Sequence, residues 1–263
     1  MNLLTAACVA VLAACSGCAH AVGGLADLGV YDRSEGRLLP VHWHEGRAYV
    51  IGRPGNEYQL NLRSRLGEDL LAVLSVDGVN VITGQTATVQ QSGYVLAPGR
   101  GLEVQGWRKD LSRTAAFYFT PLGDSYAART GRPDNVGAIG VALFRRKAPD
   151  PAPIGLAPAT PFAQAERSDS AARGAGSAAA APRAKAEAPM GTGHGRQETS
   201  YARTVAFERA SSEPAETVVI YYDSCSNLIA RGVVPRWAAP CAIPPAPLPS
   251  PNPFPGFVPD PPA

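Results

Sequence analysis

A strong β-hairpin signal lies in DLLAVLSVDGVNVITG, residues 69–84. It begins with a near-continuous apolar run over residues 70–76, which is typical of a strand buried on both faces of a sheet. Asp77-Gly78 separates this run from a second apolar run over residues 79–82. Because both turn residues must adopt positive φ, an Asp-Gly pair between two such runs predicts a β-hairpin.

Strand patterns continue on both sides of this hairpin. EYQLNLRS, residues 57–64, alternates between apolar and polar side chains, as a half-buried strand does. AAFYFTPL (115–122) places two phenylalanines on one face, and VGAIGVALFRRK (136–147) is apolar on both faces of its first part. Gly- and Pro-containing turns lie between these segments, and helical periodicity is nearly absent. Residues 25–147 are therefore predicted to form an antiparallel β-sandwich or a partly open barrel.

The composition changes sharply after this region. Residues 148–190 are rich in alanine, proline and small polar residues, which predicts a disordered linker. Residues 236–263 are proline-dense and favour polyproline II. Between them, 191–235 is predicted to add strands that complete the β domain. Strands are expected at 204–208, where apolar and polar residues alternate, at 215–224 and at 227–235. The alternative is a small separate module.

GTGHG, residues 191–195, raises the question of a phosphate-binding loop. Such a loop needs its glycines before a helix N-terminus, whereas this segment precedes a predicted strand. The P-loop and dinucleotide-binding patterns do not occur in the chain. We interpret GTGHG as a glycine-rich hinge where the chain docks back, with His194 hydrogen-bonding locally.

The first residues, MNLLTAACVAVLAAC, indicate export. Their apolar run is too short to span a bilayer and is typical of a signal peptide. Leu12-Ala13-Ala14-Cys15 resembles a bacterial lipobox, which predicts lipid attachment at Cys15 within a signal region of residues 1–21. Ser16 in the following position predicts an outer-membrane anchor facing the periplasm. The alternative is cleavage after Ala21, which would leave a soluble periplasmic protein.

The late cysteines are compatible with an oxidising compartment. Cys225 and Cys241 are predicted to pair, closing a loop of about 16 residues and contributing ~3 kcal/mol in an unstrained bond. The alternative is that both remain free thiols.

Charge and motifs argue against several function classes. The formal net charge is +2 and no basic stripe is present, so we expect no nucleic-acid partner. No nucleophile motif of the common hydrolase classes occurs, so we assign no catalytic residue and no cofactor. His42 and His44, beside Glu45, are weak ligand candidates because their i, i+2 spacing can chelate a metal. Since no third ligand is identifiable, we predict no metal site.

Aromatic side chains offer a further possibility. Several of them would suit a sugar-stacking platform on one face of a sandwich, although such residues more often fill the core. These residues are Trp43, Tyr58, Tyr94, Trp107 and Tyr126.

Long stretches of the chain resemble an uncharacterised family of exported proteobacterial proteins. The resemblance is carried by SVDGVNVITGQTA (75–87), residues 92–119, GDSYAARTGRPDNVGAIGVALF (123–144) and residues 191–235 with their GTGHG start. It implies that 191–235 belongs with the main β domain. It implies no activity, and therefore no catalytic residues.

These observations predict a non-enzymatic envelope lipoprotein. In this prediction, an N-terminal lipid tethers a β domain to the membrane, and the domain binds or assembles with another envelope component. The alternative function is a carbohydrate- or small-ligand-binding β-sandwich, with hydrolytic activity as a further option.

Overall fold

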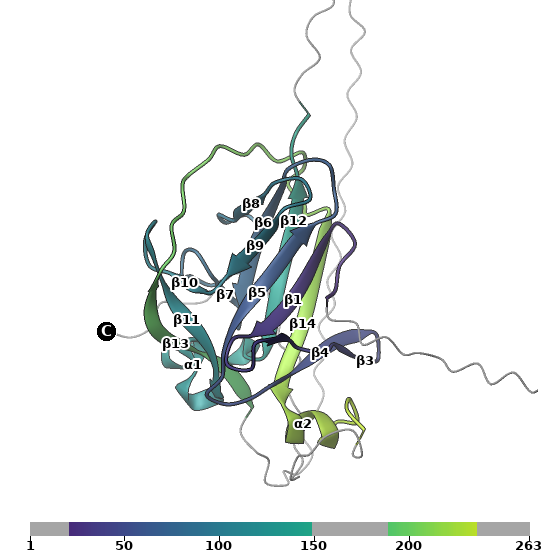
Figure 1. Cartoon of the computed structure of the whole chain (residues 1–263), viewed down its shortest axis with the longest axis vertical. Helices are drawn as coiled ribbons and strands as arrows, with labels where there is room; N and C mark the ends of the chain where they lie inside the picture. Colours follow the sequence, from purple (N-terminus) through teal and green to yellow (C-terminus); the bar gives the residue numbers. More distant parts are fainter. Residues whose placement is uncertain (1–20, 149–188, 236–263) are drawn as a thin grey trace, which may run out of the picture.

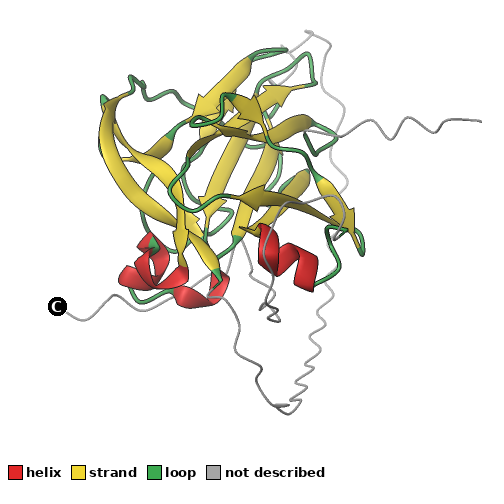
Figure 2. Ribbon diagram, turned by 60° about the horizontal axis from the view of Figure 1, so that its bottom comes forward, coloured by secondary structure: helices red, strands yellow, loops and turns green. Residues whose placement is uncertain are grey.

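The computed structural model describes residues 21–148 and 189–235. Within them, two β-sheets, with strands of different lengths, enclose one main core and do not close into a barrel (Figures 1 and 2). The predicted fold class, mainly β with two sheets, is confirmed. Residues 1–20, residues 149–188 of the predicted linker and the predicted tail 236–263 lie outside the described residues.

Each sheet contains seven strands. The first sheet consists of β1 (Ala26–Asp32), β2 (Arg37–Leu38), β5 (Glu57–Ser64), β9 (Gly101–Val104), β10 (Gly106–Arg108), β11 (Arg113–Pro121) and β13 (Met190–Thr199). The second consists of β3 (His42–His44), β4 (Arg47–Gly52), β6 (Leu70–Val76), β7 (Val79–Asn80), β8 (Tyr94–Leu96), β12 (Ala138–Arg145) and β14 (Glu216–Ser224). The strand pairs are antiparallel except for β4 and β14, which run parallel.

The helical elements are short and lie at one end of the sheets (Figure 2). They are η1 (Leu122–Asp124), α1 (Tyr126–Arg129), η2 (Pro133–Asn135) and α2 (Cys225–Ala230). Within the described ranges, no helix is long and apolar enough to cross a membrane.

The Asp-Gly hairpin forms as the sequence predicts. Asp77 has φ 53° and Gly78 φ 71°, so both occupy the left-handed region that this turn requires. β7 is shorter than expected because the Asn80 side chain accepts hydrogen bonds from the backbone N–H groups of Ile82 (2.8 Å) and Thr83 (3.0 Å). These bonds turn the chain immediately after Asn80.

The C-terminal segments contribute one strand to each sheet. β13 runs along β11, and β14 lies between β4 and β12. Three local predictions are wrong. GTGHG is the first half of β13 instead of a hinge, and residues 227–235 form most of α2 and a following turn instead of a strand. Residues 204–208, which alternate like a strand, pair with no sheet of the described ranges.

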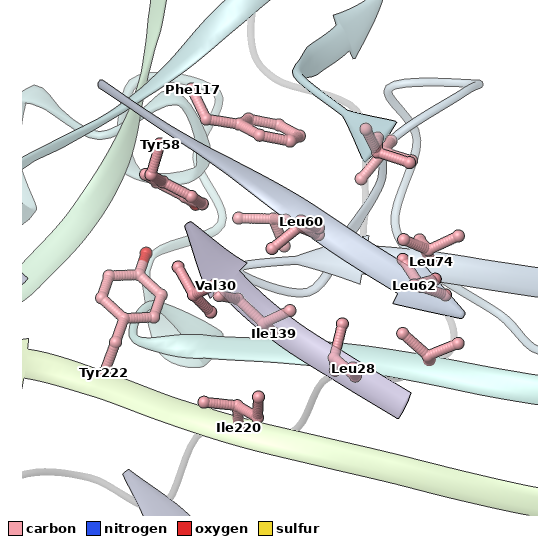
Figure 3. Packing of buried hydrophobic residues seen from close by; sticks show 14 of the residues in the cluster. Leu28, Val30, Tyr58, Leu60, Leu62, Leu74, Phe117, Ile139, Ile220 and Tyr222 are labelled. Carbon is pink, nitrogen blue, oxygen red and sulfur yellow. The ribbon is translucent and has the colours of Figure 1, made fainter. Parts of the chain in front are cut away.

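The core lies between the sheets and joins residues far apart in the sequence. Figure 3 shows Leu28 and Leu60 from the first sheet packed with Leu74, Ile139 and Ile220 from the second. All five side chains are at most 1% exposed. Burying one such side chain contributes roughly 1.5–3 kcal/mol relative to leaving it in water.

Candidate functional site

The most exposed tryptophan of the described residues lies on strand β3. β3 ends the strand order of the second sheet and pairs with β4. Trp43 is 56% exposed, whereas Trp107 is 3% exposed. Trp43 pairs with the buried Ala48, so its side chain points to the inner side of the sheet, at an edge where the core ends. This position leaves a large apolar ring in contact with solvent.

The opposite face of the same edge carries aromatic and cationic groups. The rings of Tyr49 and Tyr221 have centroids 5.5 Å apart. The Arg47 guanidinium lies 5.5 Å from the Tyr221 ring centroid, and the Arg231 guanidinium lies 5.3 Å from that of Tyr49. Cations over aromatic faces are attracted by the ring quadrupole, so the rings hold both guanidinium groups in place.

His42 and His44 flank Trp43 and point to this outer face. His42 is paired with Tyr49 and His44 with Arg47 in the β3–β4 register. Burial lowers the pKa of His42, so its imidazole is neutral at pH 7. These residues lie around one sheet edge, with Trp43 on its inner side and His42, His44, Arg47 and Tyr221 on its outer face. We call this edge, with these five side chains, the β3 surface.

The two histidines share a face, as their spacing predicts, but they gather few further ligands. The His44 Nε2 atom lies 3.9 Å from a Glu45 carboxylate oxygen. Within the described residues, no group of three or more His, Cys, Asp or Glu side chains is placed to hold a metal ion. The arrangement suits polar contacts better than metal coordination.

The five aromatic residues considered as a sugar platform do not form one. Tyr58 and Trp107 are buried, and the Trp107 indole N–H donates to the Gly193 carbonyl (3.3 Å). Tyr94 and Tyr126 are partly buried; the Tyr94 hydroxyl accepts a hydrogen bond from Arg108 (3.0 Å). Of these five side chains, only that of Trp43 is largely exposed to solvent.

A second group of polar residues lies inside the sandwich. Asp77 Oδ1 accepts hydrogen bonds from the Gly137 N–H (2.9 Å) and the Tyr222 hydroxyl (2.5 Å), and Oδ2 accepts one from the Thr192 N–H (2.7 Å). The Thr192 hydroxyl lies 2.6 Å from the hydroxyls of both Tyr222 and Tyr58. Tyr58 and Tyr222 lie near each other at one end of the core in Figure 3. The network therefore joins both sheets.

Burial decides the electrostatics of this network. It raises the pKa of Asp77 to about 7, while the hydrogen bonds from Tyr222, Gly137 and Thr192 act to lower it. It also raises the pKa of Tyr58 and Tyr222 well above the usual value. Because all four side chains of the network are at most 2% exposed, it suits a structural role rather than contact with a substrate. The sequence signals the Asp77 turn but not its distant partners.

The glycines around Thr192 serve close packing. A Cβ atom at Gly191 would lie 2.5 Å from the Ser125 Cβ atom, and one at Gly193 would enter the Tyr118 ring. His194, between Gly193 and Gly195, is exposed, and its ring lies 5.6 Å from that of Tyr126. Burial, followed by the charges of Lys109 and Arg129, lowers the pKa of His194. The glycines of this segment are therefore explained by close packing within a paired strand, and the segment is not a phosphate-binding loop.

Cys225 is the first residue of α2 and is disulfide-bonded. Cys241 and the predicted lipid-bearing Cys15 lie outside the described residues, so the Cys225–Cys241 pairing stays a prediction.

Comparison with known protein families, with curated proteins and with solved structures found no match. We therefore argue the function from the geometry of the β3 surface and of the buried network.

Proposed function

We propose that the protein is a non-enzymatic envelope lipoprotein, anchored in the outer membrane through a lipid on Cys15, whose β domain binds another envelope component through the β3 surface. The exposure of Trp43 at the end of a sheet carries the binding part of this proposal. The lipobox-like residues 12–15 support the anchor. Cleavage after Ala21 would instead give a soluble periplasmic binding protein.

The β3 surface has the composition of a protein-binding surface. Tryptophan, tyrosine and arginine are the residues that most often dominate binding energy at interfaces. Here the Arg47 guanidinium lies 5.5 Å from the Tyr221 ring centroid, and this contact would reduce the conformational entropy lost when a partner docks. The outer backbone edge of β3, unpaired within the described strands, also suits the addition of a partner strand.

The titratable groups inside the sandwich support a non-enzymatic role. Asp77 has a pKa near neutrality, which in an accessible cleft would suit general acid–base catalysis. It is 1% exposed and both of its carboxylate oxygens accept hydrogen bonds. These contacts hold strands together and leave no carboxylate oxygen for a substrate.

Site-specific photo-crosslinking in intact cells tests the binding surface. A photoreactive amino acid replaces Trp43 in one variant and Leu111 in the control variant, because both side chains are 56% exposed. Trp43 lies on β3 of the second sheet, whereas Leu111 lies in the turn between β10 and β11 of the first sheet. We expect one defined crosslinked product at position 43 and none at position 111. Equal crosslinking at both positions, or no product at position 43, would contradict the proposal.

Carbohydrate binding is the second candidate, and the exposed Trp43 ring favours it specifically. An aromatic face stacks on the apolar face of a sugar ring, and Glu45 follows two residues later. A crosslinked product at position 43 that is removed by glycan-degrading enzymes, and not by proteases, would identify this second function.

A further inference from the structure

Asp223 and Asn227 form a buried pair where β14 ends and α2 begins. The Asn227 side-chain N–H donates to Asp223 Oδ1 at 2.9 Å. The same oxygen accepts hydrogen bonds from the backbone N–H groups of Ser224 (2.7 Å) and Met190 (3.3 Å). Asp223 is 1% exposed and Asn227 is 0% exposed. One carboxylate oxygen thus gathers three donors from β13, β14 and α2.

The other two oxygens of this pair have no partner. Asp223 Oδ2 and Asn227 Oδ1 are both buried without a hydrogen bond in the described part of the chain. Two acceptors cannot satisfy each other, and an unpaired buried acceptor is costly. One proton on Asp223 Oδ2 would let the carboxylic acid donate to Asn227 Oδ1. The acid and the amide would then form a closed pair with two hydrogen bonds.

One charged group acts on the pair, and it opposes this proton. Arg231, which follows α2, acts to lower the pKa of the Asp223 carboxyl, but its effect is smaller than that of burial, which raises the pKa. Its guanidinium lies 5.3 Å from the Tyr49 ring centroid. β13 contributes the Met190 backbone N–H, and β4 packs on α2 through Tyr49 and Ile51. The pair is therefore set among apolar groups and backbone amides, with one nearby cation.

We propose that Asp223 and Asn227 form a buried proton-binding site, in which a proton held between Asp223 Oδ2 and Asn227 Oδ1 fastens α2 and the start of β13 to the end of β14. Met190, the last residue of the predicted linker, is in fact the first residue of β13. Loss of the proton leaves two unpaired oxygens at this junction. The site therefore makes the attachment of these elements sensitive to pH.

The expected pH range follows from the pKa of Asp223. Burial raises this pKa to about 6 from 3.8, against the opposing effects of Asn227, the two backbone amides and the Arg231 charge. A carboxyl group with a raised pKa in the folded state adds stability at low pH, and this stability is lost as pH rises through the folded pKa. The junction should therefore loosen as pH rises from about 4 to about 6.

Asp223→Asn is the matched test variant. Its amide keeps the acceptor oxygen and places a permanent N–H donor opposite Asn227 Oδ1, so it imitates the protonated acid at every pH. In the wild type we expect the Asp223 carboxyl carbon to titrate near pH 6 by NMR. We also expect hydrogen-exchange protection of the Met190 amide to fall about tenfold between pH 5 and 7.5, after correction for intrinsic exchange. Asp223→Asn should keep the low-pH protection throughout.

Titration of the Asp223 carboxyl near its ordinary value of 3.8 would overturn the proposal. Equal pH dependence of Met190 protection in the wild type and in Asp223→Asn would also overturn it. If the variant does not fold, the wild-type carboxyl titration decides alone.

Discussion

At the scale of single residues, Asp77 has two separate roles. Its backbone adopts the positive φ of the hairpin turn, and its carboxylate binds the backbone of β13 and the Tyr222 hydroxyl of β14. Positive φ is tolerated by Asn and Asp better than by most residues. The side chain, in contrast, is needed because two backbone N–H groups and a hydroxyl must find an acceptor inside the core.

We predict that Asp77→Asn destabilises the protein by about 1–3 kcal/mol at pH 8, because an amide N–H would face the Thr192 N–H. Urea denaturation measures this change, and Asp124→Asn, at an exposed position in η1, is the control. Since burial raises the pKa of Asp77 to about 7 from 3.8, wild-type stability from this group is lost as pH rises between these values. The variant should lack this part of the pH dependence. Wild-type-like stability of Asp77→Asn would show that the network is dispensable.

At the scale of elements, local patterns predicted the strands better than the helices. The alternation in β5 and the apolar runs of β6 and β12 are side-chain patterns, so the sequence shows them directly. β13 was misinterpreted because its glycines carry no side-chain pattern. By periodicity alone, the short apolar run in α2 is compatible with either a strand or a helix. Its helix is decided by the Ser224 cap, which accepts from the Asn227 N–H (3.2 Å), and by packing on Tyr49.

In the candidate sites too, local features could be predicted from the sequence, whereas features set by the tertiary structure could not. His42 and His44 were expected to share a face because strand residues alternate, and they do. The exposure of Trp43 depends on where the core ends, which a single strand's pattern does not reveal. The contact of Asp77 with Thr192 joins residues 115 positions apart. Such pairs follow from the sheet topology and not from any local signal.

We predict that Gly193→Ala weakens the attachment of β13 to β11 by about 1–3 kcal/mol, because the added methyl group must displace the buried side of the Tyr118 ring. Gly123→Ala is the control, since nothing lies within 4 Å of a Cβ atom there and its φ is not positive. Thermal unfolding of both variants checks the difference. Equal midpoints for the two variants would mean that β13 shifts freely along its neighbour.

At the scale of the whole described domain, the two sheets share one main core, and the β3–β4 edge of the second sheet carries aromatic side chains. Elsewhere on the surface many cations are matched by carboxylates, as in the ion pairs Arg33–Glu198 (2.9 Å) and Arg196–Glu57 (2.8 Å). Such exposed pairs add little stability, but they leave little unbalanced charge on that face. The β3 surface combines an exposed tryptophan with the Arg47 guanidinium, which lies 5.5 Å from the Tyr221 ring centroid. This combination of side chains is the reason why we propose it as the partner-binding surface.

The proposed lipid tether would determine where the β3 surface acts, and intact-mass spectrometry of membrane fractions tests it most directly. Cells expressing the wild type and Cys15→Ala are compared. We predict a wild-type mass equal to the chain from Cys15 onward plus acyl groups, and loss of this species from membranes in the variant. A mature chain that begins at Val22 in both samples would contradict the account and identify a soluble exported protein.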